Sequence, residues 1–312
     1  MGCRFGSFRV FEATQSSGTS KSQKIMKKEI IEIDKEKGIF RCTTWDERFY
    51  AKSEINKNTG LPEYKFVPSV TWIAGCYPKG IGFYKWLAEK GWDEAEAIKQ
   101  AAGDKGSKVH LAIEDMIRGK MVRMEDKYLN KTTNEEEDLT LEEYNCLMGF
   151  ADWVKERKPK FIKSEFVIFD DSIGYAGTVD CLCEIDGKIY IVDFKTSQNI
   201  WPEYELQLSA YKHAIGDPNA EMMILQIGYK RNKHSWKENI VQDKFDLFLS
   251  AKKIWQNEHG EEKPSQKDYP LELSIPKELC IIDETEKPKE EAEEEKVVKT
   301  KRAAKKAVEI NG

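Results

Sequence analysis

The sequence predicts an α/β domain in which helices flank a mixed central β-sheet. Two observations support this fold class. The elements follow one another as two helical segments (104–119 and 140–158), three strand-like segments, a helix, two strands and a helix. Within the strand-rich stretch, Asp186-Gly187 separates two runs of strand-forming residues, which is typical of a hairpin closed by a two-residue type I′ turn.

Composition indicates a polar protein with one substantial core or two smaller ones. The 312 residues are 40% hydrophobic and 34% charged, with a net charge of −5. The negative net charge does not indicate a nucleic-acid-binding protein, but it does not exclude one that has a local strip of basic residues. No apolar run reaches the roughly 20 residues that a bilayer requires. Seven cysteines without paired spacing indicate reduced thiols in a cytoplasm.

Changes in composition along the chain predict four regions. Residues 1–25 are rich in Ser, Thr, Gln and Lys, and we expect a disordered leader there. A small N-terminal β element is expected over 26–66 and the main domain over 67–282. Residues 283–312 carry a glutamate block and then a Lys/Arg block without aromatic residues, which predicts a disordered charged tail.

The main domain begins with an aromatic-rich stretch, residues 67–92. Residues 80–90 are expected to form a helix that stops at Gly91, a residue suited to a helix C-terminus. Beside Lys79 and Lys85, exposed rings would suit the stacking of unpaired bases. Aromatic clusters are more often part of a core, and we favour that interpretation for each single ring.

The next helix, 104–119, has a buried stripe with His110 and Glu114 at its edge, one turn apart. On this spacing alone, a partly buried His110 hydrogen-bonded to Glu114 is favoured over a metal ligand. Acidic residues 124–139 are expected to form a solvated loop. The stripe of 104–119 comprises Val109, Ala112, Ile113, Met116 and Ile117.

A capping box, Thr140-Leu-Glu-Glu143, predicts the start of the 140–158 helix. The alternation of residues 161–169 then predicts a strand that leads into the hairpin. Glu165 interrupts this alternation, and an exposed strand glutamate is the favoured explanation. Helix 203–215, strands 221–230 and 235–241 and helix 243–258 are expected to complete the domain.

The predicted turn sets the register of the hairpin. If Ile185 faces Lys188, Asp180 lies directly opposite Asp193, with Cβ atoms roughly 5 Å apart. Alternation places Lys195 on the face of the two aspartates, together with an apolar group. The carboxylates are therefore expected to repel each other on a surface that is not open to bulk water. The apolar group comprises Leu182, Ile189 and Ile191.

A shared proton or a bound cation would make two facing carboxylates tolerable. Hard oxygen ligands suit Mg²⁺ or Mn²⁺, which often complete their coordination with water and substrate phosphate. An adjacent lysine, Lys195, could orient an attacking water or neutralise developing charge. These residues therefore suggest metal-assisted phosphodiester hydrolysis.

Three motifs in a fixed order resemble the PD-(D/E)XK nuclease superfamily. They are Gly-Thr-Val-Asp180, then Asp193-Phe-Lys195-Thr-Ser, then Gln207-Leu-Ser-Ala-Tyr211. The pattern is similar to the RecB-like branch, which includes phage recombination exonucleases, and it covers roughly residues 103–215. The resemblance implies a restriction-endonuclease-like core with Asp180, Asp193 and Lys195 as catalytic residues.

The resemblance also implies further site residues. Gly106-x-x-x-His110 looks like the motif whose histidine joins the metal shell, so His110 becomes the expected third ligand beside Asp180, Asp193 and the main-chain carbonyl of Phe194. Gln207 and Tyr211 are expected beside the active site, where they would bind substrate. Their alternatives are a surface glutamine and a core tyrosine. Some relatives hold an iron–sulfur cluster through three downstream cysteines, and here only Cys280 follows, so no cluster is expected.

The expected function is a Mg²⁺-dependent (or Mn²⁺-dependent) DNA exonuclease acting in phage-type recombination, repair or end processing. DNA is the expected partner, together with a single-strand annealing or other recombination protein. The cytoplasm, of the host if the protein is phage-encoded, is the expected location. Two alternatives stay open. One is a structure-specific endonuclease, and the other is a non-catalytic DNA-binding subunit on the same fold, although the intact Asp/Asp/Lys set favours catalysis.

Overall fold

The computed structural model describes residues 29–43, 48–56, 60, 62–260 and 264. The leader predicted over 1–25 and the tail predicted over 283–312 lie outside the described residues. All described helices and strands belong to one structural unit, Met26–Lys267. None of these helices is both long and apolar enough to cross a membrane.

A five-stranded mixed sheet forms the centre of this unit, with the strand order β11-β10-β9-β8-β7. Strands β9 and β10 are parallel and are joined by helix α5 (Pro202–Ile215), while the other neighbours are antiparallel. The mixed α/β prediction is therefore confirmed. The five strands are β7 (Lys160–Asp170), β8 (Tyr175–Ile185), β9 (Lys188–Lys195), β10 (Glu221–Ile227) and β11 (Trp236–Val241).

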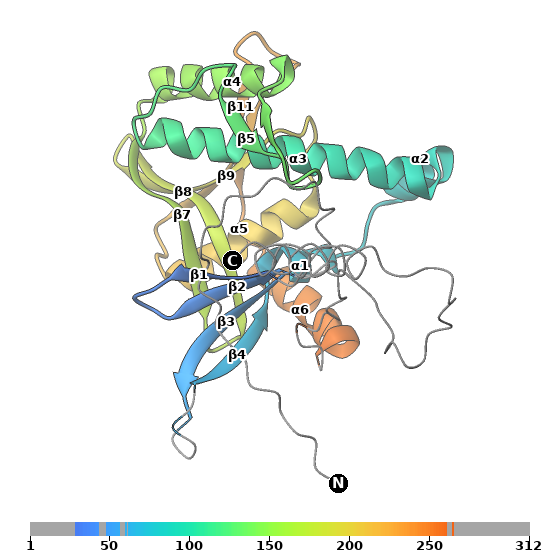
Figure 1. Cartoon of the computed structure of the whole chain (residues 1–312), viewed down its shortest axis with the longest axis vertical. Helices are drawn as coiled ribbons and strands as arrows, with labels where there is room; N and C mark the ends of the chain where they lie inside the picture. The colour runs from blue at the N-terminus through green and yellow to red at the C-terminus, as the bar shows by residue number, and fades with distance from the viewer. Residues whose placement is uncertain (1–28, 44–47, 57–59, 61, 261–263, 265–312) are drawn as a thin grey trace, which may run out of the picture. The chain divides into compact units, whose positions relative to one another are not determined.

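Helices cover both faces of the sheet (Figure 1). On one face, α3 (Trp92–Ile117) and α4 (Leu141–Arg157) pack on the buried Cys181, Cys183 and Ile185 of β8. On the other face, α5 packs together with α1 (Val70–Gly75) and α6 (Phe245–His259). Leu182, Ile189 and Ile191 belong to this second core, on the side that alternation predicts.

The hairpin β8–β9 forms as its turn predicts. Asp186 and Gly187 have φ values of 50° and 78°, the positive values that a type I′ turn needs at both central positions. The paired residues run from Ile185–Lys188 to Cys181–Val192 in unbroken register. The pairing ends there, one residue before Asp180 and Asp193, so a direct pairing of the two aspartates stays a prediction.

An antiparallel four-stranded sheet lies where the small N-terminal β element was predicted. It packs on β8, because Tyr50 and Val67 share a buried cluster with Ala176. A parallel bridge also joins Ser69 to Ala176. The strands are β1 (Glu29–Asp34), β2 (Ile39–Thr43), β3 (Arg48–Ile55) and β4 (Pro62–Pro68).

The aromatic-rich stretch only partly joins the core. Trp72 and Tyr77 pack against the α5-side core, as favoured. Helix α2 (Ile81–Lys90) buries no residue, and Tyr84 is 53% exposed and Trp92 67% exposed. The core interpretation is therefore wrong for these two rings, because α2 and the first turns of α3 extend beyond the sheet that α3 covers (Figure 1).

Two further expectations need correction. Helix α3 begins at Trp92 rather than at residue 104, and Gly91 ends α2 with a φ of 74° immediately before it. The stretch 124–139 is not a solvated loop, because it contains the paired strands β5 (Lys127–Leu129) and β6 (Glu136–Asp138). Two of its apolar residues, Tyr128 and Leu139, are buried in the α3–α4 core.

Candidate active site and metal centre

Three adjacent strands carry the acidic residues of the site. Asp193 lies on β9 and Asp180 on β8, each one residue beyond the last paired residues of the hairpin. On the other side of β8, Ser164 pairs with Cys181 and Phe166 with Val179, so Glu165 of β7 lies across from Asp180. Three carboxylates thus lie in a row across the sheet, one on each strand.

Asp180 connects the hairpin to helix α3. Its Oδ2 accepts a hydrogen bond from the main-chain N–H of Phe194 at 2.8 Å, which holds one carboxylate oxygen against β9. Its Oδ1 lies 3.6 Å from Nδ1 of His110 on α3. Asp180 is only 8% exposed, so its carboxylate contacts these neighbours rather than bulk water.

His110 is oriented by the main chain of β9. Its Nε2 lies 3.0 Å from the carbonyl oxygen of Phe194. When Nε2 carries the proton and donates it to this carbonyl, the Nδ1 lone pair points toward Asp180 and Glu165, the arrangement that a metal ligand needs. The alternative partner, Glu114, instead forms an ion pair with Arg118 at 2.5 Å.

Glu165 is the acidic residue that the sequence prediction placed outside the site. It is half-buried rather than exposed, and its Oε1 lies 3.9 Å from Nδ1 of His110. Its φ of 45° is unusual for a strand residue other than glycine, and such backbone strain costs about 1–3 kcal/mol. The break in alternation at this position was the available signal, because a strand that turns one residue out of the pleat can redirect its side chain.

These residues bring metal-ligating atoms together. One ligand atom each from His110, Glu165 and Asp180 lie within 4.8 Å of one another. Burial, then the charges of Asp180 and Glu114, raise the pKa of Glu165 to about 8. The carboxylates therefore repel each other, and a divalent cation would relieve that repulsion while meeting the oxygen and imidazole ligands that it prefers.

Asp193 and Lys195 form a buried pair beside this group. Asp193 is 1% exposed, and its Oδ2 lies 2.5 Å from Nζ of Lys195. Burial raises the pKa of Asp193 to about 6 even though Lys195 opposes the rise. Burial also opposes the charge on Lys195, but Asp193 and Asp180 outweigh it and raise the pKa of Lys195. The amine therefore stays protonated at neutral pH.

Helix α5 holds the other side of Asp193. Gln207, which is buried rather than at the surface, donates from Nε2 to Oδ1 of Asp193 at 3.3 Å and to the hydroxyl of Tyr211 at 2.8 Å. Tyr211 packs against Gly177, where an added Cβ would lie 2.7 Å from its Cε1 atom. The glycine of the Gly-Thr-Val-Asp motif is therefore required for the close approach of the tyrosine.

The predicted site residues thus gather at one end of the hairpin. Asp180, Asp193 and Lys195 lie beside His110 and the Phe194 carbonyl, and Gln207 and Tyr211 lie behind Asp193. Asp193 is not a member of the group of three that offers ligand atoms within 4.8 Å. Such a set of carboxylates, imidazole and buried lysine can hold a divalent cation and place a charged amine beside it.

Comparison with known proteins identifies the family. Two solved structures are similar at 12% identity: SSO0001, with a TM-score of 0.27 over 38% of this chain and 59% of that one, and an alkaline exonuclease (LHK-Exo) from Laribacter hongkongensis, with a TM-score of 0.30 over 59% of this chain and 81% of that one. No curated protein matches the sequence. A family model described as PD-(D/E)XK nuclease superfamily matches residues 83–308, most of the chain and the whole acidic site, so this protein belongs to the PD-(D/E)XK nuclease superfamily.

Proposed function

We propose that this protein is a divalent-metal-dependent deoxyribonuclease that degrades DNA from its ends. The observation that carries the proposal is the convergence of His110, Glu165 and Asp180 beside the buried Asp193–Lys195 pair. A site with repelling carboxylates and a neighbouring charged amine suits a metal ion and a phosphodiester together. The superfamily match supports the same reaction class.

The placement of the residues supports the following proposed roles. Asp180, Glu165, His110, Asp193 and the Phe194 carbonyl would hold Mg²⁺ or Mn²⁺. When bound, such an ion lowers the pKa of a coordinated water and stabilises charge on the phosphoryl and leaving oxygens. Lys195 orients the attacking water, because its ammonium is fixed between Asp193 and the ring of Tyr204, whose centroid lies 4.7 Å from Nζ.

Gln207 and Tyr211 act through Asp193 and the strand that carries it. Gln207 fixes Oδ1 of Asp193, and Tyr211 in turn fixes Gln207. The carboxylate therefore has one preferred orientation before substrate arrives, which lowers the reorganisation that catalysis requires. We propose that contact with the DNA strand is a further role of this pair.

The exonuclease part of the proposal rests on the resemblance to the RecB-like branch. That resemblance also suggests recombination, repair or end processing as the setting, with a single-strand annealing protein as a partner. The alternatives are a structure-specific endonuclease and a DNA-binding subunit without activity. The buried Asp193–Lys195 pair favours catalysis, because binding alone gives no reason to place a charged pair away from water.

One assay tests these possibilities together. Linear DNA labelled at the 5′ or the 3′ end and covalently closed circular DNA would each be incubated with Mg²⁺, Mn²⁺ or EDTA. The proposal expects metal-dependent degradation of linear DNA and survival of the closed circle. Cleavage of the closed circle would favour the endonuclease. No cleavage of any substrate in either metal would overturn the proposed enzyme.

A further inference from the structure

Three cationic side chains outside the central sheet lie near the acidic site, two of them within electrostatic range of Glu165 and the third within range of Lys131. Arg41 on β2 and Arg48 on β3 come from the N-terminal sheet, and Lys131 comes from the turn between β5 and β6. The charges of Lys131 and Arg41 both act on Glu165, where they oppose the rise of its pKa. Partial desolvation, and then Arg48 and Arg41, lower the pKa of Lys131, so the three cations are also near one another.

Strand pairing explains why the two arginines face the site. Arg41 pairs with Tyr50 and Thr43 pairs with Arg48, and paired residues share one face of a sheet. The hydroxyl of Tyr50 on that face lies 3.2 Å from Oγ1 of Thr178, two residues before Asp180. The face that carries both arginines is therefore the face that packs on β8.

The two sheets are also joined at the base of this face. The carbonyl of Arg48 accepts a hydrogen bond from the N–H of Ser69 at 3.1 Å, and Ser69 forms the bridge with Ala176 of β8. Arg48 is thus held at the junction between the N-terminal sheet and the strand that leads to Asp180. Its position depends on main-chain contacts rather than on a flexible loop.

None of these three cations forms an ion pair with any residue that the structure describes, and Nε of Arg41 is buried without a hydrogen-bond partner there. Other lysines on the same sheet do have acidic partners, since Lys52 lies 2.6 Å and Lys65 3.7 Å from a carboxylate oxygen of Asp171. Gathered cations without an anion repel one another, and an unpaired buried guanidinium N–H costs free energy. Among the described residues, the three cations therefore have no directly paired anion, although Lys131 and Arg41 lie within electrostatic range of Glu165.

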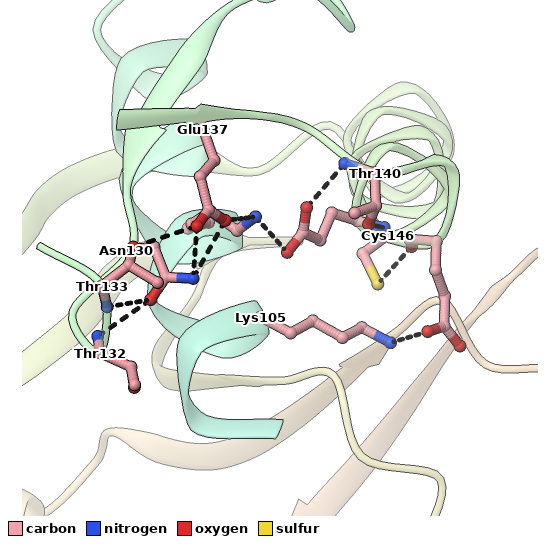
Figure 2. A network of polar contacts seen from close by, with 10 residues as sticks. Lys105, Asn130, Thr132, Thr133, Glu137, Thr140 and Cys146 are labelled. Carbon is pink, nitrogen blue, oxygen red and sulfur yellow. Dashed lines mark hydrogen bonds and ion pairs between the residues drawn. The ribbon is translucent and has the colours of Figure 1, made fainter. Parts of the chain in front are cut away.

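The turn that carries Lys131 is held in place by a polar network (Figure 2). The main-chain N–H groups of Thr132 and Thr133 donate to Oδ1 of Asn130 at 2.9 and 3.3 Å, and Asn130 donates to Glu137. Glu137 in turn accepts from Lys108 of α3 at 3.4 Å. Lys131 is thus attached to the helix that carries His110.

We propose that Arg41, Arg48 and Lys131 bind a backbone phosphate of the DNA strand, next to the phosphate that is cleaved. Guanidinium groups suit phosphate because their N–H donors match two phosphate oxygens at once. The proposal rests on the proposed nuclease function and extends it. The family match begins at residue 83, so both arginines lie outside the matched residues.

The test measures DNA binding in EDTA, so that it does not depend on cleavage. The full chain and its Arg41→Gln and Arg48→Gln variants would be titrated with labelled DNA at several salt concentrations. Each variant should bind about tenfold more weakly at low salt, and the slope of log K against log salt should fall by about one per lost phosphate contact. Lys65→Gln, on the same sheet but paired with Asp171, is the matched control and should leave the slope unchanged.

Further measurements separate the outcomes. Arg41→Lys keeps the positive charge, so its slope of log K against log salt should equal that of the parent protein. This variant keeps the proposal testable if Arg41→Gln fails to fold. With Mg²⁺, the arginine variants should raise KM for DNA while kcat changes less than threefold. Slopes and Kd values equal to those of Lys65→Gln would overturn the phosphate site even if the enzyme cleaves DNA. Binding of inorganic phosphate alone, with DNA affinity unchanged in the variants, would overturn it as well.

Discussion

The central sheet and the N-terminal sheet carry unbalanced charges of opposite sign where they meet. On the central sheet, Glu165, Asp180 and Asp193 are crowded together, and Lys195 is the one cation among the described residues that pairs with them directly. On the N-terminal sheet, Arg41 and Arg48 have no acidic partner among the described residues. A metal ion suits the first group and a phosphate the second, so a net charge of −5 conceals two local sites of opposite character.

The largest expected effect concerns the acidic sheet. Lys195→Ala should reduce the rate of DNA cleavage by a factor of at least about 10², the usual scale for removing one preorganised charged group. DNA binding in EDTA should remain within about threefold, because the cations on the N-terminal sheet are untouched. Steady-state kinetics and binding titrations check both outcomes.

Lys188→Ala is the matched control for that variant. Lys188 lies at the other end of β9, where it pairs with Glu221 at 2.6 Å, and its loss should not change cleavage. Full activity of Lys195→Ala would show that Lys195 takes no part in cleavage. It would also contradict the catalytic role that is proposed for the acidic residues of the central sheet.

The next effect tests the repulsion among the carboxylates. Because the pKa of Glu165 is raised from 4.5 to about 8 in the folded protein, its contribution to stability is present below about pH 4.5 and is lost as the pH rises through about 8. In EDTA, Glu165→Gln should flatten this loss, which is at most about 1.4 kcal/mol per pH unit. Denaturant unfolding from pH 5 to 9 measures it.

A related experiment measures how added Mg²⁺ changes the melting temperature at two pH values. Added Mg²⁺ should raise the melting temperature of the parent protein more at pH 8 than at pH 5.5, because the ligands must lose their protons before they bind the ion. Glu165→Gln should reduce this gain. An equal pH dependence of parent and variant, with and without metal, would show that Glu165 does not take part in the acidic group.

A smaller effect is expected from the packing behind Asp193. In Gly177→Ala, the new Cβ would lie 2.7 Å from Cε1 of Tyr211 and 3.3 Å from Cγ2 of Val70, and such overpacking costs about 1–3 kcal/mol. Cleavage should also slow, because Tyr211 holds Gln207. Gly103→Ala is the control, since no atom lies within 4 Å of its Cβ and alanine favours the helix. Equal melting curves for the two variants would contradict the close contact.

The smallest effect distinguishes paired from unpaired cations on the N-terminal sheet. Lys52→Gln breaks a partly exposed ion pair with Asp171, which should cost no more than about 1 kcal/mol. The salt dependence of DNA binding should stay as in the parent protein. A change as large as that of Arg48→Gln would mean that the whole sheet attracts DNA, without a defined phosphate site.

The local part of the site could be predicted from the sequence because a two-residue turn determines which residues face each other. Asp186-Gly187 set a register that runs to Cys181–Val192, one residue before Asp180 and Asp193. The two aspartates are close enough for the charge of Asp180 to act on Asp193. Glu165 was missed because its side chain is redirected by a backbone irregularity, which alternation alone interprets as a surface position.

The arginines and the long helix were missed for a different reason. The placement of Arg41 beside Glu165 depends on contacts between segments more than a hundred residues apart, and no local pattern encodes such contacts. The start of α3 was placed too late, at residue 104. In the structure, Gly103 and Gly106 both lie within the helix, and an added Cβ at Gly106 would make only an ordinary contact, 3.9 Å from Oγ1 of Thr196.

The bridge between Ser69 and Ala176 joins the N-terminal sheet to β8, which limits how far the gene can be shortened from its 5′ end. A truncated protein that starts after Pro68 would keep the β8–β9 hairpin. It would expose Ala176 and Val167 to solvent, because these residues pack against residues of the N-terminal sheet: Ile39, Tyr50 and Val67. Newly bared apolar surface favours aggregation. The N-terminal sheet is therefore expected to be an integral part of the folded domain and not a module that can be removed.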